Sequence, residues 1–316
     1  MFRTLAAFAV LATLTACGGD SGHDAGASTS MLQGKVQIDG SSTVFPITEA
    51  VAEEFGHMHG RVRVTVGVSG TGGGMKKFSN GETDITGASR PIKSSEVEAC
   101  ASANIEFVEL PVAYDGLAVV VNKDNSFVKT MTVDELNAMW KAGSTAKTWK
   151  DIRSSWPDRE FRLYAPGQDS GTFDYFTETV NGKSGNCRPD ATFSEDDNVL
   201  VTGIAGDPDG IGFFGYAYYY ENQDKLNVVG IDAGKGAVKP DLKTIESGVY
   251  APLSRPLFIY VSKKAAQRPE VDAFVDYYLG TGRQLAEEVG YVPLPEAAAA
   301  AARKRYDNLV VGTTQG

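Results

Sequence analysis

The sequence predicts an α/β fold in two lobes, each built around a mostly parallel sheet. Strand-like runs rich in valine and isoleucine alternate with helix-like segments, which is the rhythm of βαβ units. The length of 316 residues suits two lobes of roughly 100–150 residues each. Two apolar runs, 117–122 and 257–262, bracket the middle of the chain. They indicate that the chain crosses into a second lobe and later returns.

The N-terminus has the pattern of an export signal. Arg3 precedes an apolar run over 5–14, which is too short to span a bilayer. The letters LTAC, ending at Cys17, resemble the lipobox of bacterial lipoproteins, although an ordinary signal peptide with a chance cysteine is the alternative. We predict a signal peptide over 1–16, lipidation of Cys17 and a Gly/Ser-rich tether over 17–33. The protein is then exported to the cell envelope or periplasm and held on a membrane by its lipid.

The first lobe is predicted over 34–116 and 257–316. Its expected strands are KVQID, RVRVTVG, DITGAS, IEFVELPV and, after the crossing, LFIYVS (35–39, 61–67, 84–89, 105–112 and 257–262). Its expected helices cover 46–58, 269–279 and the alanine-rich tail 296–310. Ser95 and Glu98 have capping-box spacing and predict a further helix through Cys100.

The second lobe is predicted over 117–256. It opens with the apolar run LAVVVN, and Thr132 with Glu135 predicts a capped helix. A strand over 161–166 leads into a helix that begins near Ser170. A glycine-rich turn and an aromatic run follow over 204–220.

Charge excludes one class of partner. The formal net charge is −10 and the pI about 4.9, so general repulsion argues against nucleic acid. Hydrophobic residues make up 42% and charged residues 22%, values typical of a globular protein. An anionic ligand would have to be bound locally, against the charge of the whole chain.

Four loops share one chemistry, because each joins a strand end to a helix and is rich in glycine or hydroxyl residues. They are DGSSTVFP (39–46), GVSGTGGGMKK (67–77), GASRPI (87–92) and QDSGTF (168–173). Unpaired N–H groups and the positive end of the dipole attract anions to a helix N-terminus. Each loop alone could be a helix cap and nothing more. Together they predict an anion cradle between the lobes.

Two charged residues stand in these loops. Arg90 follows the strand end GAS and could bind an oxyanion through two parallel hydrogen bonds, unless it merely pairs with a carboxylate. Asp169 would repel most anions, but it could accept the proton that phosphate carries and sulfate lacks, or it could be a simple N-cap. Asp39 and Asp84 are weaker candidates for the same role. We therefore expect phosphate rather than sulfate.

A nucleophilic role for Ser170 has little support. Acyl-transfer serines need a base, usually histidine, and His23, His57 and His59 all lie away from the predicted strand ends. The G-x-S-x-G elbow and the Walker spacing are absent from the sequence. His57 and His59 do not share a helical face, so we expect no metal and no cofactor. The remaining cysteines, Cys100 and Cys187, suggest one disulfide in an oxidising compartment, or two separate buried thiols.

These motifs resemble those of the phosphate-binding proteins that serve phosphate-specific ABC transporters. The resemblance runs from about Val36 to Tyr291 and includes DGSSTVFP, GVSGTGGGMKKF, TDITGASRPI, SGTFDYF, EDDNVLV and PLSRPLFIYVS. It implies a two-lobed periplasmic-binding-protein fold, type II-like, that closes by a hinge near 110–122 and 253–263 around one phosphate. By position, it also implies a set of oxygen-binding residues: Ser42, Thr43, Ser69, Ser170, Gly171 and Thr172.

The sequence departs from the family pattern at two charged positions. The best-known members of the family carry an aspartate after G-A-S and an arginine ahead of D-x-S-G-T, where this chain has Arg90 and a neutral stretch around Pro166. We expect Arg90 and Asp169 to share the ligand's charge and proton.

The leading hypothesis is a monomeric, non-enzymatic receptor that captures inorganic phosphate and delivers it to permease subunits of an ABC transporter. The alternatives are a receptor for sulfate or molybdate, an envelope phosphatase, and an adhesin or signalling lipoprotein.

Overall fold

The structure is a computed structural model that describes residues 32–168 and 170–314. The predicted signal peptide, Cys17 and the tether up to residue 31 lie outside the described residues, as does Asp169. Within the described ranges, no helix combines the length and the apolar character needed to cross a bilayer.

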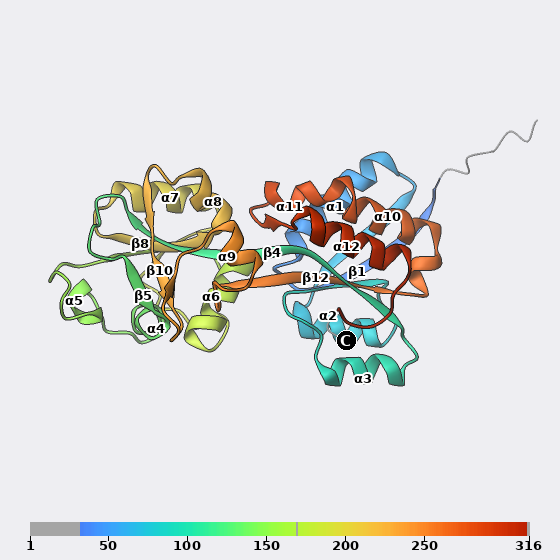
Figure 1. Ribbon diagram of the computed structural model, residues 1–316, viewed down its shortest axis with the longest axis horizontal. Helices are drawn as coiled ribbons and strands as arrows, with labels where there is room; N and C mark the ends of the chain where they lie inside the picture. The colour runs from blue at the N-terminus through green and yellow to red at the C-terminus, as the bar shows by residue number, and fades with distance from the viewer. Residues whose placement is uncertain (1–31, 169, 315–316) are drawn as a thin grey trace, which may run out of the picture. The chain divides into compact units, whose positions relative to one another are not determined.

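Ten strands form one sheet whose main path runs β2-β1-β3-β12-β4-β8-β6-β7, and β9 and β13 both pair with β4. Helices cover both faces of this sheet (Figure 1). A separate three-stranded sheet has the order β11-β10-β5. The α/β class predicted from the sequence is confirmed.

The outer parts of the chain build what we call the first core. The first part contributes β1 (Gly34–Gly40), α1 (Phe45–Met58), β2 (Val62–Val68), α2 (Gly70–Ser79), β3 (Ile85–Ala88), α3 (Ser94–Ser102) and β4 (Phe107–Asn122). The last part contributes β12 (Ser254–Ser262), η1 (Ala265–Gln267), α10 (Pro269–Leu279), η2 (Thr281–Gln284), α11 (Leu285–Glu288), β13 (Val292–Pro293) and α12 (Glu296–Asp307).

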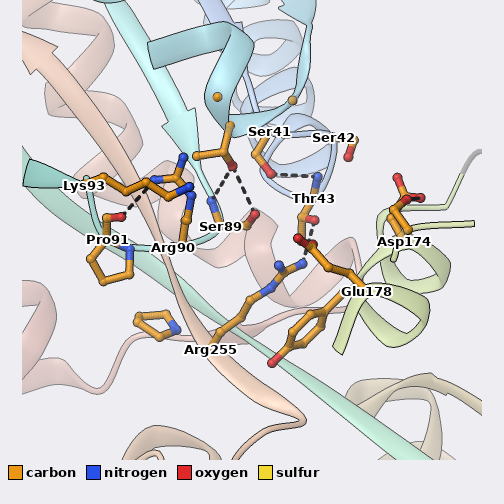
Figure 2. A pocket seen from close by; sticks show the side chains of 16 residues that line it. Ser41, Ser42, Thr43, Ser89, Arg90, Pro91, Lys93, Asp174, Glu178 and Arg255 are labelled. Carbon is orange, nitrogen blue, oxygen red and sulfur yellow. Dashed lines mark hydrogen bonds between the residues drawn. The ribbon is translucent and has the colours of Figure 1, made fainter. Parts of the chain in front are cut away.

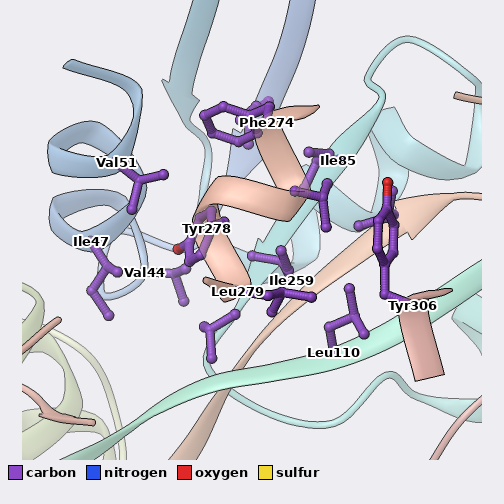
Figure 3. Packing of buried hydrophobic residues seen from close by; sticks show 14 of the residues in the cluster. Val44, Ile47, Val51, Ile85, Leu110, Ile259, Phe274, Tyr278, Leu279 and Tyr306 are labelled. Carbon is purple, nitrogen blue, oxygen red and sulfur yellow. The ribbon is translucent and has the colours of Figure 1, made fainter. Parts of the chain in front are cut away.

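In the first core, α1 and α10 pack on one face of the sheet. Ile47 and Val51 of α1 lie close to Phe274 and Tyr278 of α10 (Figure 3). The buried Thr48 and Tyr278 share a hydrogen bond of 2.9 Å between their hydroxyls, so this polar pair is satisfied inside the core. The opposite face is covered by α2 and α3 through a smaller apolar cluster: Met75, Phe78, Ala88, Ile92, Cys100, Phe107, Phe258 and Tyr260.

The middle of the chain builds the second core. Its elements are β5 (Thr130–Thr132), α4 (Val133–Trp140), α5 (Trp149–Ile152), β6 (Arg162–Pro166), α6 (Gly171–Asn181), β7 (Thr192–Ser194), α7 (Asp197–Gly206), β8 (Gly210–Gly215), α8 (Tyr216–Glu221), β9 (Leu226–Val228), β10 (Gly230–Asp232), β11 (Ala237–Val238) and α9 (Leu242–Glu246). Its centre is aromatic: Phe176 and Phe213 stack with ring centroids 3.7 Å apart, and Trp140 meets both edge-on.

Strand β4 contributes to both cores, and β12 runs beside it (Figure 1). Leu110 and Ala113 of β4 lie in the first core, whereas Leu117 and Val119 of the same strand lie in the second. β12 runs antiparallel to β4 from Ser254 opposite Gly116 to Ser262 opposite Phe107. The chain passes between the cores along this strand pair.

Three details differ from the predictions. The runs 105–112 and 117–122 form the single strand β4, because residues 113–116 continue the pairing with β12. The sheet is mixed rather than mostly parallel, because β4 and β12 run antiparallel to each other and to β8 and β3. Helix α3 begins at Ser94, and Glu96 rather than Glu98 accepts the N–H of Lys93 at its start. The capping box of Thr132 and Glu135 is confirmed.

The predicted disulfide is wrong. Cys100 and Cys187 are free thiols in the structure. Cys100, on α3, packs in the smaller cluster with Met75 and Phe78 of α2, whereas Cys187 packs against the second core, so they belong to different layers of the molecule. Burial raises the pKa of both thiols, that of Cys187 to about 11. Both side chains therefore act as small hydrophobic groups.

Candidate functional site

A pocket of about 580 Å³ lies where elements of the two cores meet (Figure 2). Its walls come from the β1–α1 loop, the start of α2, the segment after β3, helix α6 and the start of β12. The lining residues are Ser41, Ser42, Thr43, Gly70, Thr71, Gly72, Ser89, Arg90, Pro91, Lys93, Asp174, Tyr175, Glu178, Ser184, Arg255 and Pro256. Three of the four predicted loops contribute directly, and the fourth contributes through the helix it begins.

Sheet topology explains why these loops converge. β1 pairs in parallel with β2 on one side and β3 on the other, so the chain leaves its carboxyl end at a switch point of the sheet. Gly40 ends β1 with φ 153°, and a Cβ there would lie 2.3 Å from the carbonyl oxygen of Gly87. Glycine thus lets the ends of β1 and β3 approach closely.

The β1–α1 loop presents hydroxyl groups to the pocket. Thr43 is 3% exposed, and its backbone N–H donates to Ser41 Oγ at 3.1 Å. The N–H groups of Val44 and Phe45 donate to the carbonyl of Ser41. This turn holds Ser42 and Thr43 at the pocket wall, where the sequence predicted them.

Ser69 has a different environment from the predicted one. Its hydroxyl donates to Asp39, which also receives Lys77 Nζ at 2.5 Å, and Ser69 does not line the pocket. Burial alone would raise the pKa of Asp39, but the hydrogen bonds from Lys77 and Ser69 outweigh burial and lower it. The hydrogen bonds among Asp39, Ser69 and Lys77 hold α2 against the end of β1. From this loop, Gly70, Thr71 and Gly72 line the pocket.

Arg90 lines the pocket but is engaged by a carboxylate. Its two terminal nitrogens donate to the two oxygens of Glu96 at 2.7 and 2.9 Å, and one of them also donates to the carbonyl of Pro91. The sequence left open that Arg90 merely pairs with a carboxylate, and this bidentate ion pair with Glu96 is that alternative. It lowers the pKa of Glu96 against the opposing effect of burial.

The fourth loop leads into α6. Ser170 is the N-cap and accepts the N–H of Thr172 at 3.2 Å, so its hydroxyl is used within the loop. Neither residue lines the pocket, nor does Gly171, which instead lies against the backbone of Thr43. The pocket wall on this side is made by Asp174, Tyr175 and Glu178 of α6.

Arg255, on β12, is the principal residue that the sequence analysis missed. It donates from Nη2 to Thr43 Oγ1 at 2.9 Å and pairs with Asp115 at 3.3 Å. Its guanidinium carbon lies 3.5 Å from the ring centroid of Tyr175, a cation–π contact. The one signal in the sequence was an arginine at the start of an otherwise apolar strand, in PLSRPLFIYVS.

The pocket carries charge of both signs. Arg90, Lys93 and Arg255 contribute three cations, and Asp174 and Glu178 contribute two carboxylates. Figure 2 shows Arg90 and Lys93 on one side of the pocket, Asp174 and Glu178 on the other, and Arg255 between them. A small anion that can also donate a proton suits such a lining, because each kind of group then finds a partner.

The other candidate acids are occupied elsewhere. Asp84 receives Arg268 at 2.6 Å and the N–H of Gln37 at 2.9 Å, at the beginning of β3 rather than at its pocket end. Across the described ranges, no group of three or more His, Cys, Asp or Glu side chains is placed to hold a metal.

Comparison with known proteins identifies the family. A family model described as the PBP superfamily domain matches residues 25–281. The chain belongs to this superfamily. Among its curated relatives, the protein SphX of Synechococcus elongatus is 52% identical over 281 residues, which cover 88% of this chain and 83% of SphX. The phosphate-binding protein PstS of Staphylococcus saprophyticus is 40% identical over 313 residues, covering 98% and 94% of the two chains.

Comparison with solved structures agrees with this result. A possible phosphate-binding protein from Planctomyces limnophilus superposes with a TM-score of 0.86 at 48% identity, over 88% of this chain and 99% of its own. The phosphate transport receptor of Vibrio cholerae, at 22% identity, has a TM-score of 0.66 over 83% of this chain, which supports the fold alone. The family and fold implied by the sequence motifs are thus confirmed.

Proposed function

We propose that the protein binds inorganic phosphate in the pocket between its lobes and delivers it to permease subunits of an ABC transporter. As a receptor, the protein catalyses no reaction. The observation that carries the proposal is the pocket itself, which gathers hydroxyl groups, helix starts and three cations in a chain of net charge −10. The names of the relative PstS and of the Planctomyces limnophilus structure point the same way.

We assign lobe 1 to residues 34–116 and 257–316, and lobe 2 to 117–256, with the hinge near 110–122 and 253–263. The passage of β4 from one core to the other, with β12 paired along it and Leu253 of the second core directly ahead of β12, supports this division. A strand pair can act as a hinge when few backbone angles must change, and a ligand held by both lobes favours the closed arrangement.

The proposed ligand contacts follow from position. Ser42 and Thr43 bind phosphate oxygens from lobe 1, together with Arg90, and Ser69 keeps the start of α2 in place. From lobe 2, Ser170, Gly171 and Thr172 at the start of α6 bind phosphate oxygens once the lobes close. Asp169 accepts the proton of the ligand. Sulfate brings no such proton and would leave that acceptor unpaired.

We further propose that the protein reaches the envelope through the signal peptide 1–16, is lipidated at Cys17, and acts as a monomer on the tether 17–33. The polar, Gly/Ser-rich composition of the tether supports this arrangement.

The test is calorimetric titration of the purified protein, stripped of bound phosphate, with phosphate and with sulfate at two pH values. We expect a Kd for phosphate below about 1 μM and binding of sulfate weaker by at least about 100-fold. Equal affinity for both anions would favour a general oxyanion receptor, and binding of neither would refute the proposal.

A further inference from the structure

The three cations of the pocket differ in how completely they are neutralised. Lys93 is exposed. Arg90 places both terminal nitrogens on the two oxygens of Glu96. Arg255, with a side chain only 16% exposed, shares a single oxygen of Asp115, at 3.3 Å from both Nε and Nη2. The ion pair of Arg255 is the longer and less complete of the two.

Arg255 also keeps donors available. Its Nη2 is used by Thr43 and Asp115, whereas Nη1 makes no hydrogen bond within the described part of the chain. Because a guanidinium presents donors in a fixed plane, the position of Nη2 fixes that of Nη1. The residue lines the pocket, and Figure 2 shows its guanidinium next to Thr43.

Three different parts of the molecule hold this guanidinium. Thr43 belongs to the loop that starts α1 beside the first core. Tyr175, whose ring lies 3.5 Å beneath the guanidinium carbon, belongs to α6 of the second core. Asp115 stands directly opposite Arg255 in the β4–β12 register and is 2% exposed. The Tyr175 hydroxyl donates to the carbonyl of Pro252 at 2.6 Å, just ahead of β12, which ties α6 to the crossing strand.

We propose that Arg255 is the principal cation for the phosphate ligand, and that through Thr43, Tyr175 and Asp115 it connects the bound ligand to both lobes and to the crossing strands. This inference rests on the proposed function. From the sequence, we expected Arg90 to neutralise the charge of the ligand. We assign this role to Arg255 on β12 instead, and Arg90, paired with Glu96, keeps an accessory role. A cation on the crossing strand reaches the ligand from the hinge side, so it can hold the ligand whichever lobe binds first.

The test compares phosphate binding by four forms of the stripped protein: wild type, Arg255→Gln, Arg90→Gln and Arg153→Gln. Arg153 is the matched control, because it also pairs with a carboxylate, Glu135, and stacks on an aromatic ring, Trp156, but lies outside the pocket. We expect Arg255→Gln to weaken phosphate binding by about 10- to 150-fold, the loss of one charge-assisted contact, and by more than Arg90→Gln. Arg153→Gln should bind phosphate as the wild type does.

Each outcome has one meaning. A wild type that binds phosphate with Arg255→Gln equally tight overturns this inference and leaves the proposed function standing. A larger loss in Arg90→Gln than in Arg255→Gln also overturns it. A wild type that binds no phosphate refutes the proposed function and this inference with it. Should Arg255→Gln not fold, Arg255→Lys decides, because it keeps the charge but loses the planar fork: about 10-fold weaker binding supports the inference, and unchanged affinity contradicts it.

Discussion

Gly171, the first residue of α6, lies against the backbone of Thr43 in the β1–α1 loop: a Cβ at Gly171 would lie 2.8 Å from Thr43 Cα and 3.1 Å from Thr43 N. These residues come from elements of different cores and meet beside the pocket. Real Cβ atoms do not approach backbone this closely, so any side chain here must push the two elements apart. Because glycine has no side chain, Gly171 allows the two lobes to approach this closely.

Gly171→Ala should weaken phosphate binding by about 10-fold or more while leaving the melting temperature nearly unchanged. The added methyl obstructs the approach of α6 to Thr43 but enters neither core. The matched control is Gly206→Ala at the end of α7, where a Cβ meets no atom within 4 Å. Calorimetry on both variants checks this, and wild-type affinity in Gly171→Ala would contradict it.

Asp169→Asn should reduce the preference for phosphate over sulfate by about 10-fold or more, because an amide can donate to an oxygen of sulfate where the carboxylate cannot. The control is Asp174→Asn, which changes a carboxylate in the pocket wall in the first turn of α6. The readout is the ratio of the two dissociation constants. If Asp174→Asn alters the ratio and Asp169→Asn does not, the proton acceptor is Asp174.

Asp39→Asn should lower the free energy of unfolding by about 1–2 kcal/mol at pH 7, because Lys77 and Ser69 lose a charged acceptor. The pKa of Asp39 is lowered in the folded state from its ordinary value of 3.8. Its contribution to the free energy of unfolding is therefore present above about pH 3.8 and is lost as the pH falls below that value through the folded-state pKa. The difference between variant and wild type should thus shrink in acid. Urea melts at pH 7 and pH 3 measure it, with the exposed Asp158→Asn as control; a difference independent of pH would count against the assignment.

Asp197, at the start of α7, should make the protein less stable at neutral pH than in mild acid. Burial, with added repulsion from Asp196 and Glu195, raises its pKa from 3.8 to about 7. A carboxyl group with a raised pKa favours the folded state at low pH, and this stability is lost as the pH rises from about 4 to about 7. The loss is on the order of 1 kcal/mol, because solvent reaches the half-buried side chain and screens it.

Asp197→Asn should therefore be more stable than the wild type at pH 8 and differ less from it at pH 5. Chemical unfolding at the two pH values measures this difference. Asp224→Asn, on an exposed turn after α8, is the control and should follow the wild type. An Asp197→Asn variant whose stability changes with pH as steeply as that of the wild type would contradict the prediction.

Local patterns sufficed for most of the elements. Strong strand runs and short-range caps, such as Thr132 with Glu135, depend on neighbours in sequence, so they could be predicted from it. The continuity of β4 could not be predicted, because Tyr114 and Asp115 extend the strand through pairing with the distant strands β12 and β13. The mixed sheet could not be predicted for the same reason, because whether two neighbouring strands run parallel or antiparallel depends on which distant strands pair.

The loops of the site could be found from the sequence, but the partners of their charged residues could not. Arg90 stood out because it follows a strand end, yet its engagement by Glu96 depends on how α3 begins. Arg255 was missed because its environment is assembled from Thr43, Asp115 and Tyr175, the nearest of which is 80 positions away by number (255 − 175). The hydrogen bonds of Asp39 with Lys77 and Ser69 likewise form only in the folded chain, so the sequence did not indicate them.

The most direct test of the central claim is a crystal structure of the phosphate-saturated protein. We predict electron density for one tetrahedral anion between the lobes, within hydrogen-bond distance of Thr43, of the start of α6 and of Arg255. Density for the anion at another surface, or an empty pocket at saturating phosphate, would contradict the account.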